Sequence, residues 1–511
     1  MTFIYTSGSD WSEKKLSEAW KHIEVIAKEE LQLDYFDPQF EIVDSSRMLD
    51  LYASIGMPIM YNHWSFGKHY IQQANSYQKG NTGLALELVI NSDPGICYLM
   101  DENTITQQVM VMAHAACGHA AFFKNNVFFK QWTDPGSIID YLDFAKKYIN
   151  ECEEKYGYEA VEKVLDACHA LQDYGVDRYK KPKKISIENE IKRRALREEA
   201  TQQNLNILWS TIPDDKNKIS SNKYQLYPRE PEENILYFIE KNAPKLEQWQ
   251  REIVRIVRKI AQYYYPQKQT KVANEGFATF THQYIMRRLH EKELIDDGSY
   301  MEFLACHSSV VYQPDYSSKH WSGFNPYALG SDILHDIKRI CTEPTKEDEE
   351  WFPELIGKNW VDEVKNAAYN YRDESFIQQF LSPTLIRKWK LFKVHDEARE
   401  SYMKIEQIHN DDGFQEVRKS LAKQHSLGYR EPEILVNNVN LNGSRQLFLR
   451  HNRYNGVGLN QTTARKVLNN LEYLWGYPVC IDSYESFKNQ DGSWDEKRAV
   501  SYDSLTTTIN Y

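Results

Sequence analysis

The chain has 511 residues, too many for one compact core, which predicts two or more packed units. Hydrophobic residues make up 41% of it and charged residues 26%, a balance typical of globular proteins and not of disordered chains. The formal net charge of −11 excludes a general basic field for nucleic acid or for an anionic membrane surface. We therefore expect no nucleic acid partner.

No stretch of the sequence predicts a membrane span or a secretory signal. The most apolar segment, Val109–Phe123, is 15 residues long and contains two histidines, whereas a spanning helix needs about 18 or more apolar residues. The seven cysteines are scattered singly, without a CxxC pair. This distribution is typical of buried thiols in a reducing compartment, so the expected location is the cytoplasm.

Helical patterns dominate the first four-fifths of the chain. Amphipathic spacing, start signals or opposite-charge pairs predict four helices, over Trp11–Leu31, Pro135–Tyr156, Ile185–Asn206 and Leu246–Tyr264. Pro266 is expected to stop the last of these. Residues 211–234 combine Pro, Ser, Asn and charge with little apolar periodicity, which predicts a linker or a long surface loop.

Near residue 410 the pattern changes. A charged helix is predicted over Gly413–Gln424, followed by two alternating runs separated by Asn442-Gly443, a strong hairpin signal. A helix over Gln461–Trp475 and a strand over Pro478–Tyr484 complete an α-β-β-α-β unit. The predicted organisation is a large helical N-terminal domain (residues 1–410) and a small α+β C-terminal domain (residues 411–511).

Two histidines, His114 and His119, lie in an apolar, alanine-rich segment. Imidazole is costly to bury unless its nitrogens are satisfied, and it is the commonest side chain to bind metals. On an α-helix the i,i+5 spacing would set the rings about 140° apart, so only a π-bulge near Gly118 would direct both at one ion. Otherwise the two are core histidines bonded to backbone carbonyls, and the segment alone leaves both interpretations open.

A second segment, Val272–His282, opens another predicted helix. Its string NEGFA resembles a segment of gluzincin zinc aminopeptidases, and this resemblance implies that Glu275 is a metal ligand, although it lies 156 residues beyond His119. Taken alone, the string is better explained by Asn274 capping a helix with Glu275 in its first turn. Together with the two histidines, however, Glu275 completes the open ligand set of catalytic zinc, which predicts a divalent metal site.

Other residues are candidates for the chemistry of such a site. His282 shares a helical face with Glu275 about 10 Å further along the axis, so we expect it beside the metal rather than on it. Asp173 and Asp177 are candidates for a general base or a partner of a ligand histidine, although such a face is more often a polar seam between helices. Tyr327 is a candidate donor to an oxyanion.

The predicted metal site lacks an obvious general base. Zinc peptidases with the HExxH motif place a glutamate between the two histidines, where this chain has Ala115. Losing such a base typically costs roughly 10²–10⁴-fold in rate. A carboxylate at the open metal position, such as Asp173, Asp177 or Glu102, would favour an enzyme, whereas apolar groups alone would favour a scaffold.

Strings spread over nearly the whole chain resemble the SpoVR family, the stage V sporulation protein R group, and especially its Gram-negative branch. They include SIGMPIMYNHWSFGKHY, DYGVDRYKKP, NEGFATF, FNPYALG and DESFIQQFLSP. The resemblance implies a role in building the peptidoglycan cortex of spore formers. In other bacteria it implies a stress or stationary-phase role beside a PrkA-type serine kinase and a von Willebrand A-domain protein.

The residues and the resemblances lead to one expectation and one alternative. The expected N-terminal domain is zincin-like and binds one divalent metal through His114, His119 and Glu275. Zinc suits these ligands best, and iron or manganese also fit. As an enzyme, the chain would cleave a peptide or amide bond. The family resemblance implies that the substrate is related to peptidoglycan. The alternative is a non-catalytic scaffold or regulator that works with the kinase and the von Willebrand A-domain protein.

Overall fold

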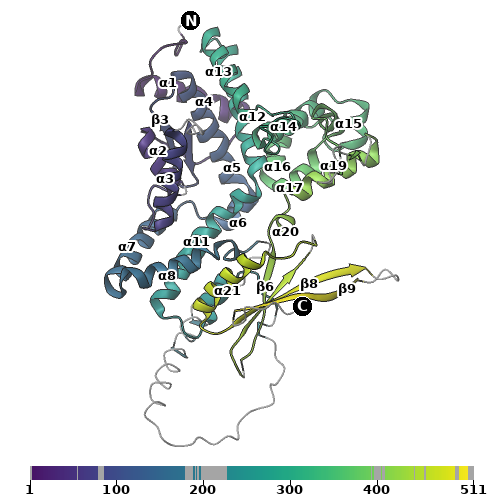
Figure 1. Ribbon diagram of the computed structural model, residues 1–511. Helices are drawn as coiled ribbons and strands as arrows, with labels where there is room; N and C mark the ends of the chain where they lie inside the picture. Colours follow the sequence, from purple (N-terminus) through teal and green to yellow (C-terminus); the bar gives the residue numbers. More distant parts are fainter. Residues whose placement is uncertain are drawn as a thin grey trace, which may run out of the picture. The chain divides into compact units, whose positions relative to one another are not determined.

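The computed structural model describes residues 3–54, 56–78, 86–178, 230–392, 409–441, 443–453, 456–488 and 494–504, with a few short stretches between them. It is mainly helical, with a small sheet-containing C-terminal region (Figure 1). The chain forms two compact units. The first consists of Met1–Asp166 and Lys259–Pro432, and the second of Ala167–Arg258 and Glu433–Tyr511.

The N-terminal part of the first unit combines helices with a three-stranded sheet. Its elements are α1 (Glu13–Val25), η1 (Ile26–Glu30), β1 (Pro38–Val43), α2 (Ser45–Ala53), α3 (Trp64–Gln78), β2 (Glu87–Ile90), β3 (Gly95–Met100), α4 (Ile105–Met112), η2 (Ala113–His119), α5 (Ala120–Asn125), α6 (Val127–Trp132) and α7 (Ile138–Tyr156). The strand order is β1-β3-β2, with β1 parallel and β2 antiparallel to β3.

The later part of the first unit is helical apart from a two-stranded pairing of β4 with β5. Its elements are α12 (Lys271–Glu291), α13 (Asp297–Val310), α14 (Pro326–Thr342), α15 (Lys346–Trp351), α16 (Trp360–Asn370), α17 (Asp373–Phe380), α18 (Pro383–Lys388), β4 (Val394–His395), β5 (Lys404–Ile405), α19 (Asp411–Gln424) and α20 (Leu427–Arg430).

The second unit carries a four-stranded sheet in the order β6-β7-β8-β9. Its elements are η3 (Gln172–Tyr174), α10 (Ile235–Asn242), β6 (Glu433–Val439), β7 (Leu447–Asn452), α21 (Gln461–Trp475), β8 (Val479–Lys488) and β9 (Trp494–Asp503), and the chain passes between the units within α8 (Tyr158–His169) and α11 (Gln248–Gln269). The predicted domain boundary near residue 410 stays a prediction.

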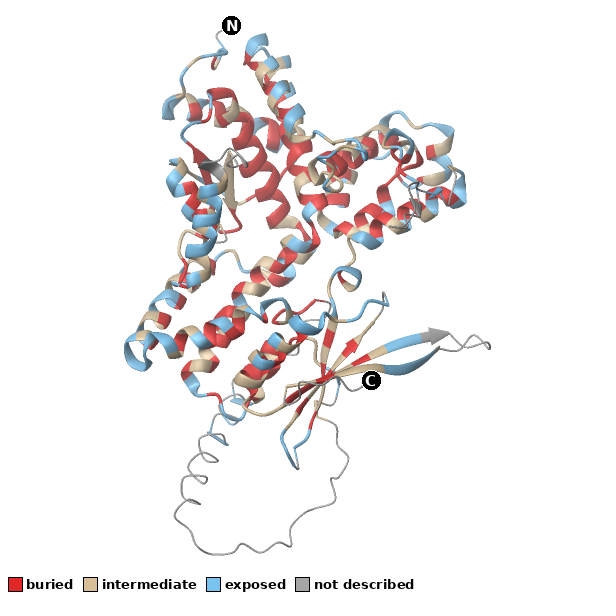
Figure 2. Ribbon diagram, in the orientation of Figure 1, coloured by how far each residue is buried: buried red, intermediate tan, exposed pale blue. Residues whose placement is uncertain are grey.

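The core of the first unit is centred on the segment formed by α4, η2 and α5. Thr104 and Gln107 make a capping box that starts α4, and the chain then continues through η2 into α5 without leaving the helical path. All seven residues of η2 are buried. Figure 2 shows this buried segment beside α12, whose residues are also mostly buried. An apolar, alanine-rich sequence therefore becomes the inner helix of the unit.

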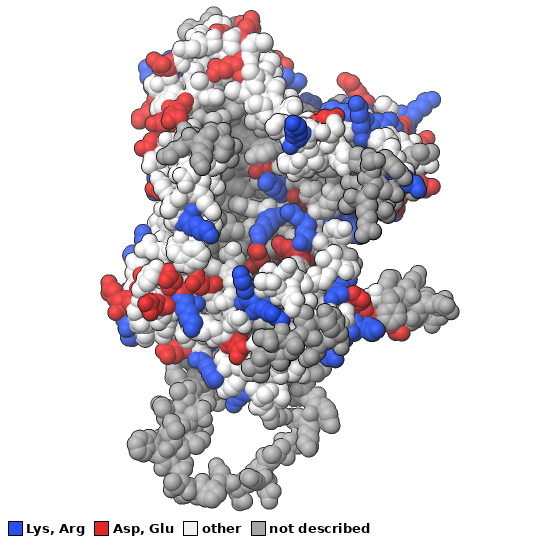
Figure 3. Space-filling view, viewed as in Figure 1, with Lys and Arg blue, Asp and Glu red and all other residues white. Residues whose placement is uncertain are grey.

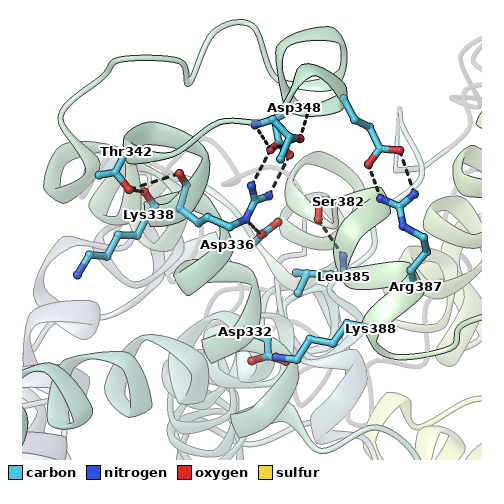
Figure 4. A network of polar contacts seen from close by, with 12 residues as sticks. Asp332, Asp336, Lys338, Thr342, Asp348, Ser382, Leu385, Arg387 and Lys388 are labelled. Carbon is cyan, nitrogen blue, oxygen red and sulfur yellow. Dashed lines mark hydrogen bonds and ion pairs between the residues drawn. The ribbon is translucent and has the colours of Figure 1, made fainter.

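A polar network holds α14 against α15 and α18 (Figure 4). Arg339 on α14 donates to Asp336 at 2.8 Å and to Asp348 on α15 at 2.6 Å. Burial alone would raise the pKa of Asp348, but hydrogen bonds from Arg339 and Thr345 outweigh it and lower that pKa. On α18, Lys388 pairs with Asp332 at 2.7 Å. The network fixes the helix that carries Tyr327.

The described helices follow the predicted ones with local differences. The helix predicted over Trp11–Leu31 is an α-helix that ends in the π-helical turn η1, and the helix predicted from Pro135 begins at Ile138. Pro266 does not stop α11, which continues to Gln269. Pro266 removes one backbone hydrogen bond from the last turns of α11, and the helix continues for three residues beyond it. Most of the helix predicted over Ile185–Asn206 and most of the predicted linker lie outside the described residues.

The C-terminal hairpin is confirmed. Strands β6 and β7 pair antiparallel, with Val439 opposite Leu447, on either side of the Asn-Gly turn, of which Asn442 lies outside the described residues. The predicted unit was incomplete in one respect, since β8 extends to Lys488 and a fourth strand, β9, pairs with it. Strand β9 is charged and exposed in its first half, so it lacks the apolar alternation that predicts a strand.

None of the described helices is both long and apolar enough to cross a membrane. On the face drawn in Figure 3, basic and acidic side chains are interspersed in small groups. This distribution agrees with the net charge of −11, which predicts no extended basic surface.

Candidate metal centre

His114 and His119 come from the π-helix η2, Ala113–His119. A π-helix repeats its backbone hydrogen bond at i→i+5, which is the spacing of the two histidines. Their ring centroids are 4.6 Å apart and the ring planes lie at 88° to each other. The structure therefore contains the local distortion that the sequence required for both imidazoles to face one position.

Glycines allow the helices around this position to approach closely. A Cβ at Gly118 would lie 2.5 Å from the Cα of Ala278, so η2 and α12 are in backbone contact there. A Cβ at Gly276 would lie 2.4 Å from the Cα of Gly330, which gives α12 and α14 the same close approach. Glu275 and Tyr327 each lie within one helical turn of such a contact. The close approach of α12 and α14 therefore places both side chains near the histidines.

The three predicted metal ligands lie together. Oε2 of Glu275 is 4.0 Å from Nε2 of His114 and 3.5 Å from Nε2 of His119. The three side chains are only 8–17% exposed. Two imidazole nitrogens and one carboxylate oxygen from η2 and α12 thus surround a common position.

A fourth residue, Glu87 at the start of β2, was not predicted from the sequence. Its Oε1 is 3.4 Å from Nε2 of His114, and ligand atoms of Glu87, His114 and His119 all lie within 4.8 Å of one another. Burial, together with the nearby Glu275, raises the pKa of Glu87 well above its ordinary value. The one available sequence signal was a single glutamate within the apolar run LALELVI.

Oε2 of Glu87 and Oε2 of Glu275 are both buried without a hydrogen-bond donor. Buried polar atoms in native structures are nearly always satisfied, and a positive charge placed between two such carboxylates would satisfy both oxygens. The donor set of two imidazoles and two carboxylates suits zinc, iron or manganese. The residues present therefore fit a divalent cation.

Hydrogen bonds orient both histidines toward this position. Nδ1 of His119 lies 2.9 Å from Oδ1 of Asn274. An amide oxygen can only accept, so the ring hydrogen of His119 lies on Nδ1. The lone pair of His119 is then on Nε2, the nitrogen that faces Glu275. Asn274 is not the helix cap considered above, because α12 starts at Lys271. Burial, and then the neighbouring His119 and His282, lower the pKa of His114 and keep it neutral, the form that binds metals.

His282 and Tyr327 both contact His114. Nδ1 of His282 lies 2.8 Å from Nδ1 of His114. His282 therefore contacts the ring nitrogen of His114 that does not face Glu87 and Glu275. The Tyr327 ring stacks on His114, with centroids 6.2 Å apart. Burial and the carboxylates of Glu275 and Glu87 raise the pKa of Tyr327, which keeps its hydroxyl protonated as a hydrogen-bond donor.

The other carboxylates considered as bases belong to other segments of the chain. Asp173 and Asp177 belong to the second unit, whereas Glu87, His114, His119 and Glu275 belong to the first. Asp177 is buried and accepts a hydrogen bond from Asn234 at 3.1 Å. Glu102 is exposed. The catalytic assignment of Asp173 and Asp177 stays a prediction, and Glu87 is the additional carboxylate that contacts the histidines.

Comparisons with known proteins place the chain in a family. A family model described as SpoVR like protein matches residues 10–430, and one described as SpoVR-like C-terminal domain matches residues 432–486. The chain belongs to the SpoVR-like family. It is also 49% identical over 488 residues to a protein of Escherichia coli (strain K12) described as uncharacterized protein YcgB, covering 96% of this chain and 94% of that one. No solved structure matches the chain.

Proposed function

We propose that His114, His119 and Glu275 hold one divalent metal ion, with Glu87 beside it, and that the chain uses the ion to hydrolyse a peptide or amide bond. The observation that carries this proposal is Oε2 of Glu275, which is buried without a hydrogen-bond donor and lies 3.5 Å from Nε2 of His119, while Oε1 of Glu87 lies 3.4 Å from Nε2 of His114. A buried carboxylate either stays neutral or needs a positive charge beside it, and a bound cation would supply that charge. Zinc is the first metal to test.

The surrounding side chains supply what a hydrolytic centre needs. A divalent metal contributes Lewis acidity and lowers the pKa of bound water. Glu87 stands in the place of the glutamate that HExxH supplies and Ala115 lacks, because it is a carboxylate next to a ligand histidine. Burial raises the pKa of Glu87, which favours a carboxyl group that can hold a proton. Tyr327 offers a protonated hydroxyl to a developing negative charge. The family resemblance suggests a peptidoglycan-related substrate.

The zincin-like assignment is part of the same proposal. It is supported by two histidines on one helical segment and a glutamate on a second helix, α12. The departure from HExxH is specific, since the histidines are five residues apart on a π-helix and the additional carboxylate comes from a strand of the neighbouring sheet. We therefore propose a zincin-like ligand set on a different local scaffold.

One observation favours a second candidate function. Glu87 Oε1 lies as close to the histidine nitrogens as a metal ligand would. Four protein ligands close a zinc site and make it structural, whereas three leave a position for water and substrate. If Glu87 is a fourth ligand, the chain is a metal-stabilised scaffold or regulator, for which the family resemblance suggests the kinase and the von Willebrand A-domain protein as partners.

Metal content tests the centre itself. Protein purified without an affinity tag and without chelator should contain about one equivalent of zinc, iron or manganese by elemental analysis. The double variant His114→Ala, Glu275→Ala should lose it, whereas the exposed control Glu102→Gln should keep it. Undiminished metal in the double variant would contradict the proposal.

Substitution of Glu87 separates the two functions. Cobalt(II) replaces zinc in such sites, and its visible absorption reports the number and type of ligands. If Glu87 stands beside the metal as a base, Glu87→Gln should leave cobalt affinity and absorption unchanged while peptide or amide hydrolysis falls by roughly 10²-fold or more. If Glu87 is a ligand, the same variant should bind cobalt more weakly and change its spectrum, which favours the scaffold.

A further inference from the structure

Three buried imidazoles lie in a row behind the candidate metal position. Nδ1 of His114 is 2.8 Å from Nδ1 of His282, and Nε2 of His282 is 2.9 Å from Nδ1 of His307. The rings come from three elements, η2, α12 and α13, and the residues are only 6%, 1% and 9% exposed. Phe303 packs against the last two rings, with centroid distances of 6.0 and 5.6 Å.

The hydrogen atoms of this row can be arranged in two ways. A neutral imidazole has one N–H and one lone pair, so a ring that accepts on one side must donate on the other. Each contact in the row joins two ring nitrogens, so each hydrogen bond needs an N–H on one ring and a lone pair on the other. Either every hydrogen points toward His307, or every hydrogen points toward His114.

The first arrangement is the one that prepares His114 for a metal. Its hydrogen then lies on Nδ1 and its lone pair on Nε2, the nitrogen 3.4 Å from Glu87. In the opposite arrangement His114 carries its hydrogen on Nε2, where it points at Glu87 and blocks the lone pair that a metal needs. The choice between the two depends on whether His307 offers a lone pair or a hydrogen to His282, and on the backbone of Ala278, which also hydrogen-bonds the His114 ring.

We propose that His282 and His307 are positioning residues that hold His114 in its metal-binding tautomer. The proposal rests on the metal centre described under the proposed function and adds a determinant of its affinity. His307 does not touch the ligand histidine, yet it sets the direction of the row by accepting from Nε2 of His282 through its Nδ1. Partners of this kind behind a ligand histidine typically change metal affinity roughly 10–100-fold when removed.

Two variants of His307 with side chains of similar length separate acceptance from packing. His307→Gln keeps an acceptor oxygen for His282, whereas His307→Met keeps volume without a comparable acceptor. We expect zinc affinity, measured by competition with a chromophoric chelator, to stay within about threefold of wild type for the Gln variant. For the Met variant it should fall roughly 10-fold or more. Circular dichroism checks that both variants fold.

A spectroscopic measurement on the unsubstituted protein gives a second test. In metal-free, ¹⁵N-histidine-labelled protein, His282 should carry its hydrogen on Nε2, and His282→Asn identifies its resonances. The Gln variant should keep this tautomer and the Met variant should shift it toward Nδ1–H. If His307 acted only through packing, the tautomer of His282 would be the same in the wild type and in both variants.

The outcomes distinguish this proposal from the metal centre on which it rests. If the wild type binds zinc but the Gln and Met variants are equally tight or equally weak, the positioning role is overturned and the centre stands. An Nδ1–H tautomer of His282 in the wild type would overturn it as well. If the wild type binds no zinc, iron or manganese, the metal centre fails and the positioning role fails with it.

Discussion

Asp373, the first residue of α17, is a buried carboxylate that contacts the first turn of α12, the helix that carries Glu275. Its oxygens accept hydrogen bonds from the amides of Val272 and Ala273, each at 3.0 Å. Burial raises the pKa of Asp373 from 3.8 to about 7, and the backbone donors offset only part of this rise. His425, whose Nδ1 is 4.0 Å away, has its own pKa lowered to about 4 by burial and by Arg430, so it is largely neutral in this range.

The raised pKa of Asp373 predicts a pH-dependent term in stability. Between pH 4 and pH 7 the folded chain keeps a proton that the unfolded chain has lost. The resulting stabilisation is complete below pH 4 and is lost as the pH rises to 7, at up to about 1.4 kcal/mol per pH unit. Asp373→Asn should remove this term, so the free energy of unfolding of the wild type relative to the variant should fall as pH rises. Urea titrations at pH 4 to 8 measure it.

The control for this prediction is an exposed carboxylate. Asp362 on α16 has a side chain that is 60% exposed, and Asp362→Asn should leave the pH dependence parallel to that of the wild type. Parallel curves for Asp373→Asn as well would show that Asp373 titrates alike in the folded and unfolded chains.

At the scale of elements, the contact between η2 and α12 is the one on which the centre depends. A methyl group at Gly118 would meet the backbone of Ala278, which cannot yield as a flexible side chain would. Gly118→Ala should therefore cost about 1–3 kcal/mol and separate the histidines from Glu275. Chemical unfolding gives the stability, and elemental analysis should show lost metal.

Gly67 on α3 supplies the matched control. A Cβ there would meet nothing within 4 Å, so Gly67→Ala should stabilise the helix by up to about 1 kcal/mol and leave metal content unchanged. Equal effects of the two substitutions would mean that the close approach at Gly118 is not required.

The polar network around α14 permits a comparison of two arginines (Figure 4). Arg339 pairs with Asp336 and Asp348, whose side chains are 5% and 1% exposed. Arg339→Met would leave both buried carboxylates without this partner and should destabilise the first unit by about 3–5 kcal/mol. Arg387 pairs with Glu347 at the surface, with 45% and 33% exposure, so Arg387→Met should cost about 1 kcal/mol or less. Thermal or urea unfolding measures both, and equal losses would refute the distinction.

Features set by local spacing could be predicted from the sequence, whereas contacts made through packing could not. The helical patterns, the Asn-Gly hairpin and the pairing of histidines through a π-turn follow from local spacing, so they were predictable. Glu87 precedes His114 by 27 residues and reaches it through strand pairing with β3 and packing of the sheet on η2. Neither interaction has a fixed spacing in the chain. The histidine row was hidden for the same reason, because His307 and His282 meet only through helix packing.

At the scale of the whole molecule, the chain is interleaved rather than divided end to end. Each compact unit is built from two separate stretches of sequence. The change of texture near residue 410 indicates a different C-terminal segment, but no local pattern indicates that Ala167–Arg258 packs in the same unit as Glu433–Tyr511. All four residues of the candidate centre lie in the first unit.

This division predicts how metal should affect unfolding. A ligand that binds only the native state stabilises it by RT ln(1 + [L]/Kd), about 2.7 kcal/mol at a free metal concentration 100 times the Kd. In differential scanning calorimetry, zinc should therefore raise the transition of the first unit and leave that of the second unit in place. Trp475→Ala identifies the second transition, because Trp475 is 3% exposed and stacks on Phe238 within that unit. Zinc should raise the same first transition in this variant, and in His114→Ala it should raise neither. A zinc-induced shift of both transitions by the same amount would show that the chain unfolds as one cooperative block.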